Sequence, residues 1–240
     1  VHNLIHREQM AAKQLTFTSR RVTDERSSEF LSSRDNWLRP VYIRTGPDGC
    51  LWFADMYRAV IEHPKWIPAD WQKRLDLRAG HQLGRIYRIV PVGRAPRQIP
   101  RLDRLNTGEL VRALDSPNGW QRDLAQELLI HRGDRRALNP LLSQAVSSPR
   151  PLGRLHSMCA AAGLKGLTPA VVAASLSDKH PGVRRHAVRL AETLTTITPD
   201  LLNTLLSLSK DPDPQVRLQL AFSSGTLGKP EQQALSLIHI

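Results

Sequence analysis

One local pattern recurs four times in the second half of the chain, and it limits the fold more than any other feature. In each copy, a turn containing Pro is followed by an Arg that enters an apolar stretch. These arginines are Arg122, Arg154, Arg184 and Arg217, at spacings of 32, 30 and 33 residues. Self-similarity at a fixed period of about 20–50 residues is typical of a solenoid. We therefore expect about four repeats within residues 105–230, each made of two short helices.

The apolar residues of these repeats have helical spacing, as in the stripe from Val183 to Leu190. The last repeat is expected to hold helices over 198–209 and 214–223, with Asp211 in the preceding turn, where an acidic cap is favoured. The pattern resembles the HEAT repeat in a short version. The recurring Asp and Arg residues are expected to bond between adjacent repeats. The resemblance implies a scaffold, or a surface for a protein or for another domain of the same chain.

The first half of the chain has the β-branched and aromatic content of strands. Residues 46–49 read Gly-Pro-Asp-Gly, which predicts a turn because Pro presets φ and Gly accepts positive φ. The expected strands are residues 16–21, 41–44, 50–54 and 84–90. A long irregular insertion, 56–83, separates the last two, and such insertions are usually functional. Strand, tight turn and strand is typical of β-propeller blades, although a hairpin in an α+β domain has the same pattern.

Four stretches carry a closer resemblance. They read Asn-Trp-Leu-Arg-Pro-Val-Tyr-Ile-Arg-Thr-Gly-Pro-Asp-Gly at 36–49, Ala-Asp-Met-Tyr-Arg at 54–58, Ile-Glu-His-Pro-Lys-Trp-Ile-Pro at 61–68 and Gly-Arg-Ile-Tyr-Arg-Ile at 84–89. With the opening Val-His-Asn-Leu-Ile-His-Arg, they resemble the membrane-bound dehydrogenases of planctomycetes and verrucomicrobia. The resemblance implies a propeller related to quinone-dependent glucose and sorbosone dehydrogenases, then helical repeats, then a c-type haem domain.

The expected fold class is therefore mixed, with two domains. Residues 1–93 would be the all-β terminal blades of a propeller, 94–104 a linker, and 105–230 an all-α HEAT-like solenoid. Residues 231–240 would be a tail, of which 235–240 resemble a translated adaptor and are expected to be non-native. The chain is taken as a fragment of a longer protein.

The resemblance implies an exported, periplasmic or cell-surface dehydrogenase. It would oxidise a sugar or alcohol and pass electrons to a haem domain outside these residues. No cofactor is expected within the fragment, whereas a quinone, calcium and haem c are possible in the full-length protein. Whether the protein is an enzyme is left open, although the parent protein is expected to be an oxidoreductase. The fragment is not expected to be active alone, since the main catalytic base of related propellers lies earlier in the chain. The alternative is a non-enzymatic propeller–HEAT scaffold that binds protein or polysaccharide.

Two residues of the insertion are the candidate catalytic residues. His63 could act as the base that takes a hydroxyl proton from the substrate, and Arg58 could hold negative charge that develops on a quinone. The alternative interpretation is structural. In it, Arg58 and Glu62 form a surface ion pair at i and i+4, and His63 caps a turn.

The net charge of +12 and the pI of about 10.6 invite a nucleic-acid interpretation. It is not favoured, because the arginines are scattered and no block of five or six like charges occurs. His2 and His6 lack a carboxylate at helical spacing, so no metal site is predicted. The sequence contains no run of 18 apolar residues, so it predicts no membrane span.

Overall fold

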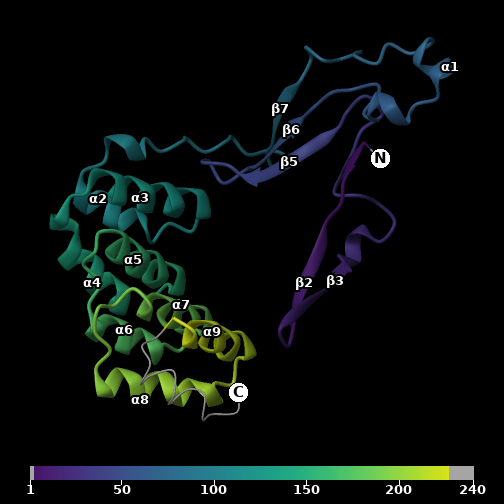
Figure 1. The fold of residues 1–240 in the computed structure, drawn as a ribbon. Helices are drawn as coiled ribbons and strands as arrows, with labels where there is room; N and C mark the ends of the chain where they lie inside the picture. Colours follow the sequence, from purple (N-terminus) through teal and green to yellow (C-terminus); the bar gives the residue numbers. More distant parts are fainter. Residues whose placement is uncertain (1–2, 227–240) are drawn as a thin grey trace. The chain divides into compact units, whose positions relative to one another are not determined.

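A computed structural model describes residues 3–226 of the protein, which divide into two compact units (Figure 1). The first unit holds the residues up to Ile99 except Gln14–Thr16, which are grouped with the second unit and its residues from Pro100 on. The strands lie in the first unit and all helices longer than four residues lie in the second. The predictions for His2 and for the tail at 231–240 fall outside the described residues.

The second unit is a series of short helices. They are α2 (Thr107–Ala113), α3 (Gly119–Arg132), α4 (Leu138–Ser147), α5 (Pro151–Gly163), α6 (Pro169–Leu176), α7 (Pro181–Ala191), α8 (Pro199–Ser207) and α9 (Pro214–Ser224). Three 3₁₀ turns accompany them, η3 (Leu102–Arg104), η4 (Arg135–Ala137) and η5 (Leu208–Lys210).

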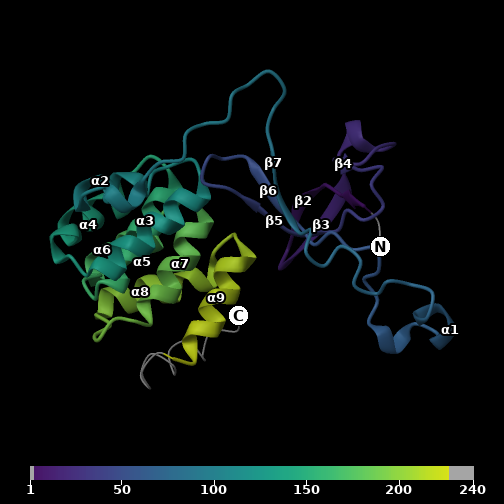
Figure 2. The same ribbon diagram turned by 90° about the horizontal axis from the view of Figure 1, so that it is seen from above.

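These helices stack as pairs, which confirms the predicted helical repeats. Helix α2 packs on α3, α4 on α5 and α6 on α7, while η5, which continues α8, packs on α9. The first helices of the pairs contact one another in the order α2, α4, α6, α8, and the second helices in the order α3, α5, α7, α9 (Figure 2). We call these two rows the first-helix layer and the second-helix layer.

The helices begin where the sequence supplies a cap and a proline. Helices α5, α6, α7, α8 and α9 all begin at Pro. In all of them except α5, the N-cap side chain accepts a hydrogen bond from a backbone N–H of the first turn. This arrangement satisfies amides that the first turn leaves free. The cap of α9 is Asp213, which accepts from the Gln215 amide, and not Asp211 as the sequence predicts. Asp211 is engaged elsewhere, by Arg184.

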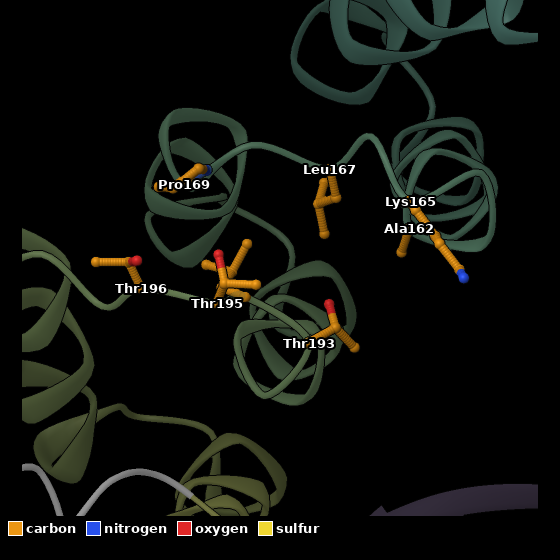
Figure 3. Close-up of a pocket in the computed structure, with 8 residues that line it drawn as sticks. Ala162, Lys165, Leu167, Pro169, Thr193, Thr195 and Thr196 are labelled. Carbon is orange, nitrogen blue, oxygen red and sulfur yellow. The ribbon is translucent and has the colours of Figure 1, made fainter.

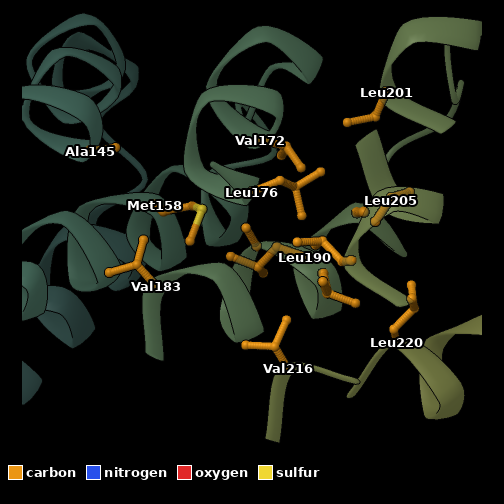
Figure 4. Close-up of a cluster of buried hydrophobic side chains, with 14 residues drawn as sticks. Ala145, Met158, Val172, Leu176, Val183, Leu190, Leu201, Leu205, Val216 and Leu220 are labelled. Atoms are coloured by element: carbon orange, nitrogen blue, oxygen red, sulfur yellow. The ribbon is translucent and has the colours of Figure 1, made fainter. Parts of the chain in front are cut away.

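Two apolar clusters lie between the layers. One is built around Val172, Leu176, Leu205 and Leu220, each at most 1% exposed (Figure 4). The other is built around residues of α2, α3 and α4, such as Leu110. Because a single short helix pair cannot bury its apolar stripe alone, each pair depends on its neighbours for stability.

Buried ion pairs link successive repeats, as the recurrence of Asp and Arg predicts. Arg154 donates to both carboxylate oxygens of Asp178 at 2.6 and 2.8 Å, and Arg184 donates to both of Asp211 at 2.7 and 2.8 Å. Each arginine also donates to the backbone carbonyl six residues before it, at Ser148 and Asp178 respectively. Each arginine thus binds a carbonyl in the turn before its own helix and a carboxylate in the turn before the second helix of the next repeat.

Within the described part of the chain, Arg122 of the first repeat does not form such an ion pair. Arg122 is buried and donates to the Ser116 carbonyl at 2.7 Å, but no ion pair joins it to a carboxylate within residues 3–226. Ser148 stands where the next two repeats have Asp178 and Asp211, six residues before an arginine. The Ser148 hydroxyl instead donates to Asp115 at 2.7 Å.

We expect the helical unit to lose stability in two stages as the pH falls. Burial and neighbouring cations lower the pKa of His156 and of His186, so below about pH 6.5 the unfolded chain takes up these protons first. Burial alone would raise the pKa of Asp178 and of Asp211, but hydrogen bonds from Arg154 and Arg184 outweigh it and lower both. The stability from these carboxylates is therefore complete above about pH 4 and is lost below it.

Denaturant unfolding, followed by circular dichroism at several pH values between about 8 and 3, measures this dependence. A free energy of unfolding that stays constant or rises over this range would contradict it. A variant with both histidines replaced by Gln should lose only the first of the two stages.

The first unit contains three small antiparallel sheets. Strand β1 (Leu4–Ile5) pairs with β4 (Leu31–Ser32), and β2 (Glu8–Lys13) pairs with β3 (Thr16–Arg21). The largest sheet has three strands in the order β5 (Pro40–Thr45), β6 (Leu51–Asp55) and β7 (Arg85–Ile89). The 3₁₀ turns η1 (Thr23–Glu25) and η2 (Pro64–Trp66) and the four-residue α1 (Ala69–Gln72) complete the unit.

The prediction of propeller blades was wrong. A propeller blade is a four-stranded sheet, and no sheet within residues 3–226 has more than three strands. The turn at 46–49 forms as predicted, with the Gly49 amide bonded to the Gly46 carbonyl and φ of +80° at Gly49. Such a turn joins any two antiparallel strands, so it does not specify the sheet to which they belong. The fold of this unit is a set of small sheets, with a minor core around Ile5, Leu38 and Phe53.

Candidate functional site

The structure places the two predicted catalytic residues in different settings. His63 is exposed and caps η2, where its Nδ1 accepts from the Lys65 amide at 3.1 Å. Arg58 is half-buried, and its Nη1 is buried without a hydrogen-bond partner in the described part of the chain. The ion pairs found among residues 3–226 do not include one between Arg58 and Glu62. A catalytic role for His63 and Arg58 stays a prediction, since nothing in the structure tests it.

A buried polar cluster of the first unit surrounds Asp55, at the end of β6. The Asp55 side chain is fully buried, and its Oδ1 accepts from the amides of Arg39 at 2.7 Å and Tyr57 at 2.9 Å. Its Oδ2 accepts from Nε of Arg85 at 3.2 Å and from Nη2 at 2.9 Å. The Arg85 guanidinium lies 3.8 Å from the centre of the Tyr57 ring, which Trp37 also contacts.

The Asp55 cluster holds the chain together where β6 leaves the sheet. Tyr57 has φ of +50°, a left-handed conformation that costs free energy in a residue other than Gly. Two contacts hold Tyr57 in that conformation: its amide donates to the Asp55 carboxylate, and its ring packs against the Arg85 guanidinium. Sequence reasoning missed Asp55, although an acidic residue that ends an apolar strand next to Met-Tyr-Arg was a visible signal.

One cavity of the helical unit, of about 560 Å³, lies between the turn after α5 and the turn after α7 (Figure 3). Three threonines, at positions 193, 195 and 196, supply most of its polar groups. Lys165 also lines it, but in Figure 3 its side chain points away from the threonines. Among residues 3–226, no His, Cys, Asp or Glu lines this cavity, so these residues offer it no group that titrates near neutral pH.

Charge is distributed unevenly over the second-helix layer. Helices α5, α7 and α9 contain five arginines and no Asp or Glu. Two of the arginines, Arg154 and Arg184, are neutralised by Asp178 and Asp211. The ion pairs of these helices within residues 3–226 include neither the half-buried Arg185 nor the exposed Arg189 of α7. Helix α3, in contrast, carries the exposed carboxylates of Asp123 and Glu127.

Apolar side chains accompany these charges. Leu152 on α5 is 46% exposed and Phe222 on α9 is 68% exposed. Phe222 and Leu218 line a groove of about 160 Å³ between α7 and α9, together with Arg185, Arg189, His186, Gln215 and Gln219. The groove therefore combines cations, amides and apolar side chains.

The pKa of His186 is affected by the cations that line this groove. Burial lowers the pKa of His186, and the nearby Arg185, Arg189 and His156 lower it further. No acidic group contributes in the opposite direction. The Nδ1 atom of His186 is buried without a hydrogen-bond partner among the described residues. Sequence reasoning missed this site because it singled out only Arg184 on this helix and did not consider Arg185 or Arg189.

The chain was compared with known families, curated proteins and solved structures. Residues 1–93 match the model of a domain of unknown function, DUF7133. No curated protein matches the chain. Solved structures that match include the complex of CpcE and CpcF of phycocyanin lyase from Nostoc sp. PCC7120, at 22% sequence identity and a TM-score of 0.45. That match covers 55% of this chain and 86% of the other. At this identity and TM-score the likeness carries no functional argument.

The resemblance to quinone-dependent dehydrogenases was wrong, and so was the activity inferred from it. The matching family model describes a domain without a known function, and the solved structure is a lyase complex. Neither is a dehydrogenase or a quinone-binding propeller, and the sheets of the first unit are not blades. The quinone, calcium and haem c and the exported location are untested and stay predictions.

Two further observations limit the chemistry of the described residues. Within 3–226, no three His, Cys, Asp or Glu side chains are grouped so that they could hold a metal ion. No helix in this range is long and apolar enough to cross a membrane. Cys50 and Cys159 are both free thiols, and burial raises the pKa of each, which makes them poor nucleophiles at neutral pH.

Proposed function

We propose that this chain is a binding protein whose helical unit holds a protein partner on the second-helix layer. The observation that carries the proposal is the exposed surface of α5, α7 and α9. It presents Leu152, Phe222 and the un-neutralised Arg185 and Arg189 from neighbouring helices. Exposed apolar side chains next to arginines are typical of protein interfaces.

The architecture supports the same proposal. Stacked helix pairs form an extended surface on which each pair contributes one helix. The two buried ion pairs and the shared apolar clusters hold the helices α5, α7 and α9 in register. A surface preorganised in this way loses little conformational entropy when a partner binds.

Peptide display on the full chain tests this proposal. We expect selection from a random-peptide library to enrich peptides that bind the purified chain. Replacing Phe222 with Ser or Arg189 with Ala should weaken that binding about 5-fold or more, because interface energy is concentrated in aromatic and arginine residues.

Control variants on the first-helix layer should leave the affinity unchanged. Val146 of α4, 49% exposed, and Arg112 of α2, also exposed, supply the matched changes Val146→Ser and Arg112→Ala. Enriched peptides that bind equally well to all four variants would place the site elsewhere and overturn the proposal. An absence of enriched peptides would also overturn it.

A further inference from the structure

The groove between α7 and α9 has the chemistry to select one class of partner. It contains two cations, Arg185 and Arg189, one turn apart on α7. Gln215 and Gln219 line the groove from α9, also one turn apart, and the side-chain amide of Gln219 donates to the Ser223 hydroxyl at 3.1 Å. Phe222 extends this side of the groove by a further turn and is mostly exposed.

We propose that this groove binds an acidic segment of the partner protein, with a carboxylate between Arg185 and Arg189 and an apolar side chain against Phe222. The inference rests on the proposed function and specifies the partner's chemistry. Charge complementarity carries it, because the described residues that line the groove include Arg185 and Arg189 but no Asp or Glu. The carboxylate of Glu192, at the C-cap of α7, is engaged by the Ser223 hydroxyl of α9.

His186 strengthens the argument for an anionic ligand. Burial lowers its pKa, and Arg185 and Arg189 of the same helix, which also line the groove, lower it further. Arginine donates to a carboxylate through a fixed pair of N–H groups, and such charge-assisted bonds are stronger than neutral ones. A carboxylate in the groove would therefore replace water around Arg185 and Arg189 at little cost.

The observations favour a protein segment over a nucleic acid. A duplex presents a regular row of phosphates and requires many cations along the surface. Here the groove holds two arginines, no lysine and an exposed Phe222. The same layer carries Asp123 and Glu127 on α3, which would repel a phosphate backbone that continued along it.

Fluorescence anisotropy on the full chain tests the inference. The probes are a labelled peptide that alternates Glu with Leu and Phe, the same peptide with every Glu replaced by Gln, and a labelled DNA duplex. We expect the Glu peptide to bind about 10-fold or more tightly than the Gln peptide, with an affinity that falls as salt increases. The double variant R185E/R189E should bind the Glu peptide about 10-fold or more weakly than the unmodified chain.

The control is R112E, which changes an exposed arginine of α2 in the first-helix layer and should bind the Glu peptide normally. Equal binding of the Glu and Gln peptides would overturn the inference, as would normal binding by R185E/R189E. So would DNA that binds more tightly than the Glu peptide and is released by the same double variant. If displayed neutral peptides still depend on Phe222, the proposed function stands and only the acidic preference fails. Circular dichroism confirms that each variant folds.

Discussion

Replacing Asp178 with Ala is expected to lower the free energy of unfolding of the helical unit by about 3 kcal/mol. The side chains of Arg154 and Asp178 are 5% and 9% exposed, so the guanidinium would remain buried without its carboxylate. Asp178 also accepts from the His180 amide at 2.7 Å, and this bond before α7 would be lost as well. Denaturant unfolding followed by circular dichroism measures the change.

A double variant separates the buried charge from the loss of contacts. R154M/D178A removes both charges, and we expect it to be more stable than D178A alone, because most of the cost is the unpaired guanidinium. The matched control is D123A, since the Asp123 side chain is 72% exposed on α3 and its loss should change stability by less than about 0.5 kcal/mol. A double variant that is less stable than D178A would show that Arg154 stabilises the fold even without Asp178, for example through its bond to the Ser148 carbonyl, contrary to this account.

Replacing Asp55 with Ala is expected to destabilise the first unit by about 2–4 kcal/mol while the helical unit stays folded. The substitution leaves the buried amides of Arg39 and Tyr57 without an acceptor, and Arg85 without the carboxylate that holds it beside Tyr57. The apolar core of this unit is small, so its free energy of unfolding is expected to be small as well, and a loss of this size would be a large part of it.

Amide hydrogen exchange resolves the two units. In D55A, exchange should become faster over β5, β6 and β7 and stay unchanged over α5 and α7. D55N keeps an oxygen for the two amides but loses the charge that binds Arg85, and its effect should be intermediate. D70A is the control, because Asp70 is 84% exposed and should not alter exchange. Unchanged protection of the strands in D55A would contradict the structural role assigned to this carboxylate.

The helical unit could be predicted in detail because its determinants are local and repeated. Helix α9 begins at Pro214, and α8 at Pro199, within one residue of the expected starts. Proline and an acidic or hydroxyl side chain mark such starts in the sequence itself. The buried links of Arg154 to Asp178 and of Arg184 to Asp211 follow from the same repetition.

The first unit could be predicted only as far as its strands. The turn at 46–49 and the strands on both sides of it were expected, but the number of strands that join them was not. Strand pairing depends on residues far apart in the chain, such as Phe53 and Tyr87, which stack at 5.0 Å. A local turn signal carries no information about such partners, and it led to the wrong propeller and dehydrogenase interpretations.

The sequence by itself determined that residues from about 105 on form paired helices with a repeat of 30–33 residues, since caps, prolines and apolar spacing act over a few residues. Only the tertiary structure decided which charges remain free. Arg184 and Arg185 are adjacent in sequence, yet one binds the buried Asp211 and the other faces the groove beside Phe222. The physical reason is that neutralisation depends on which face of α7 meets the next repeat, and that is set by how the helices pack.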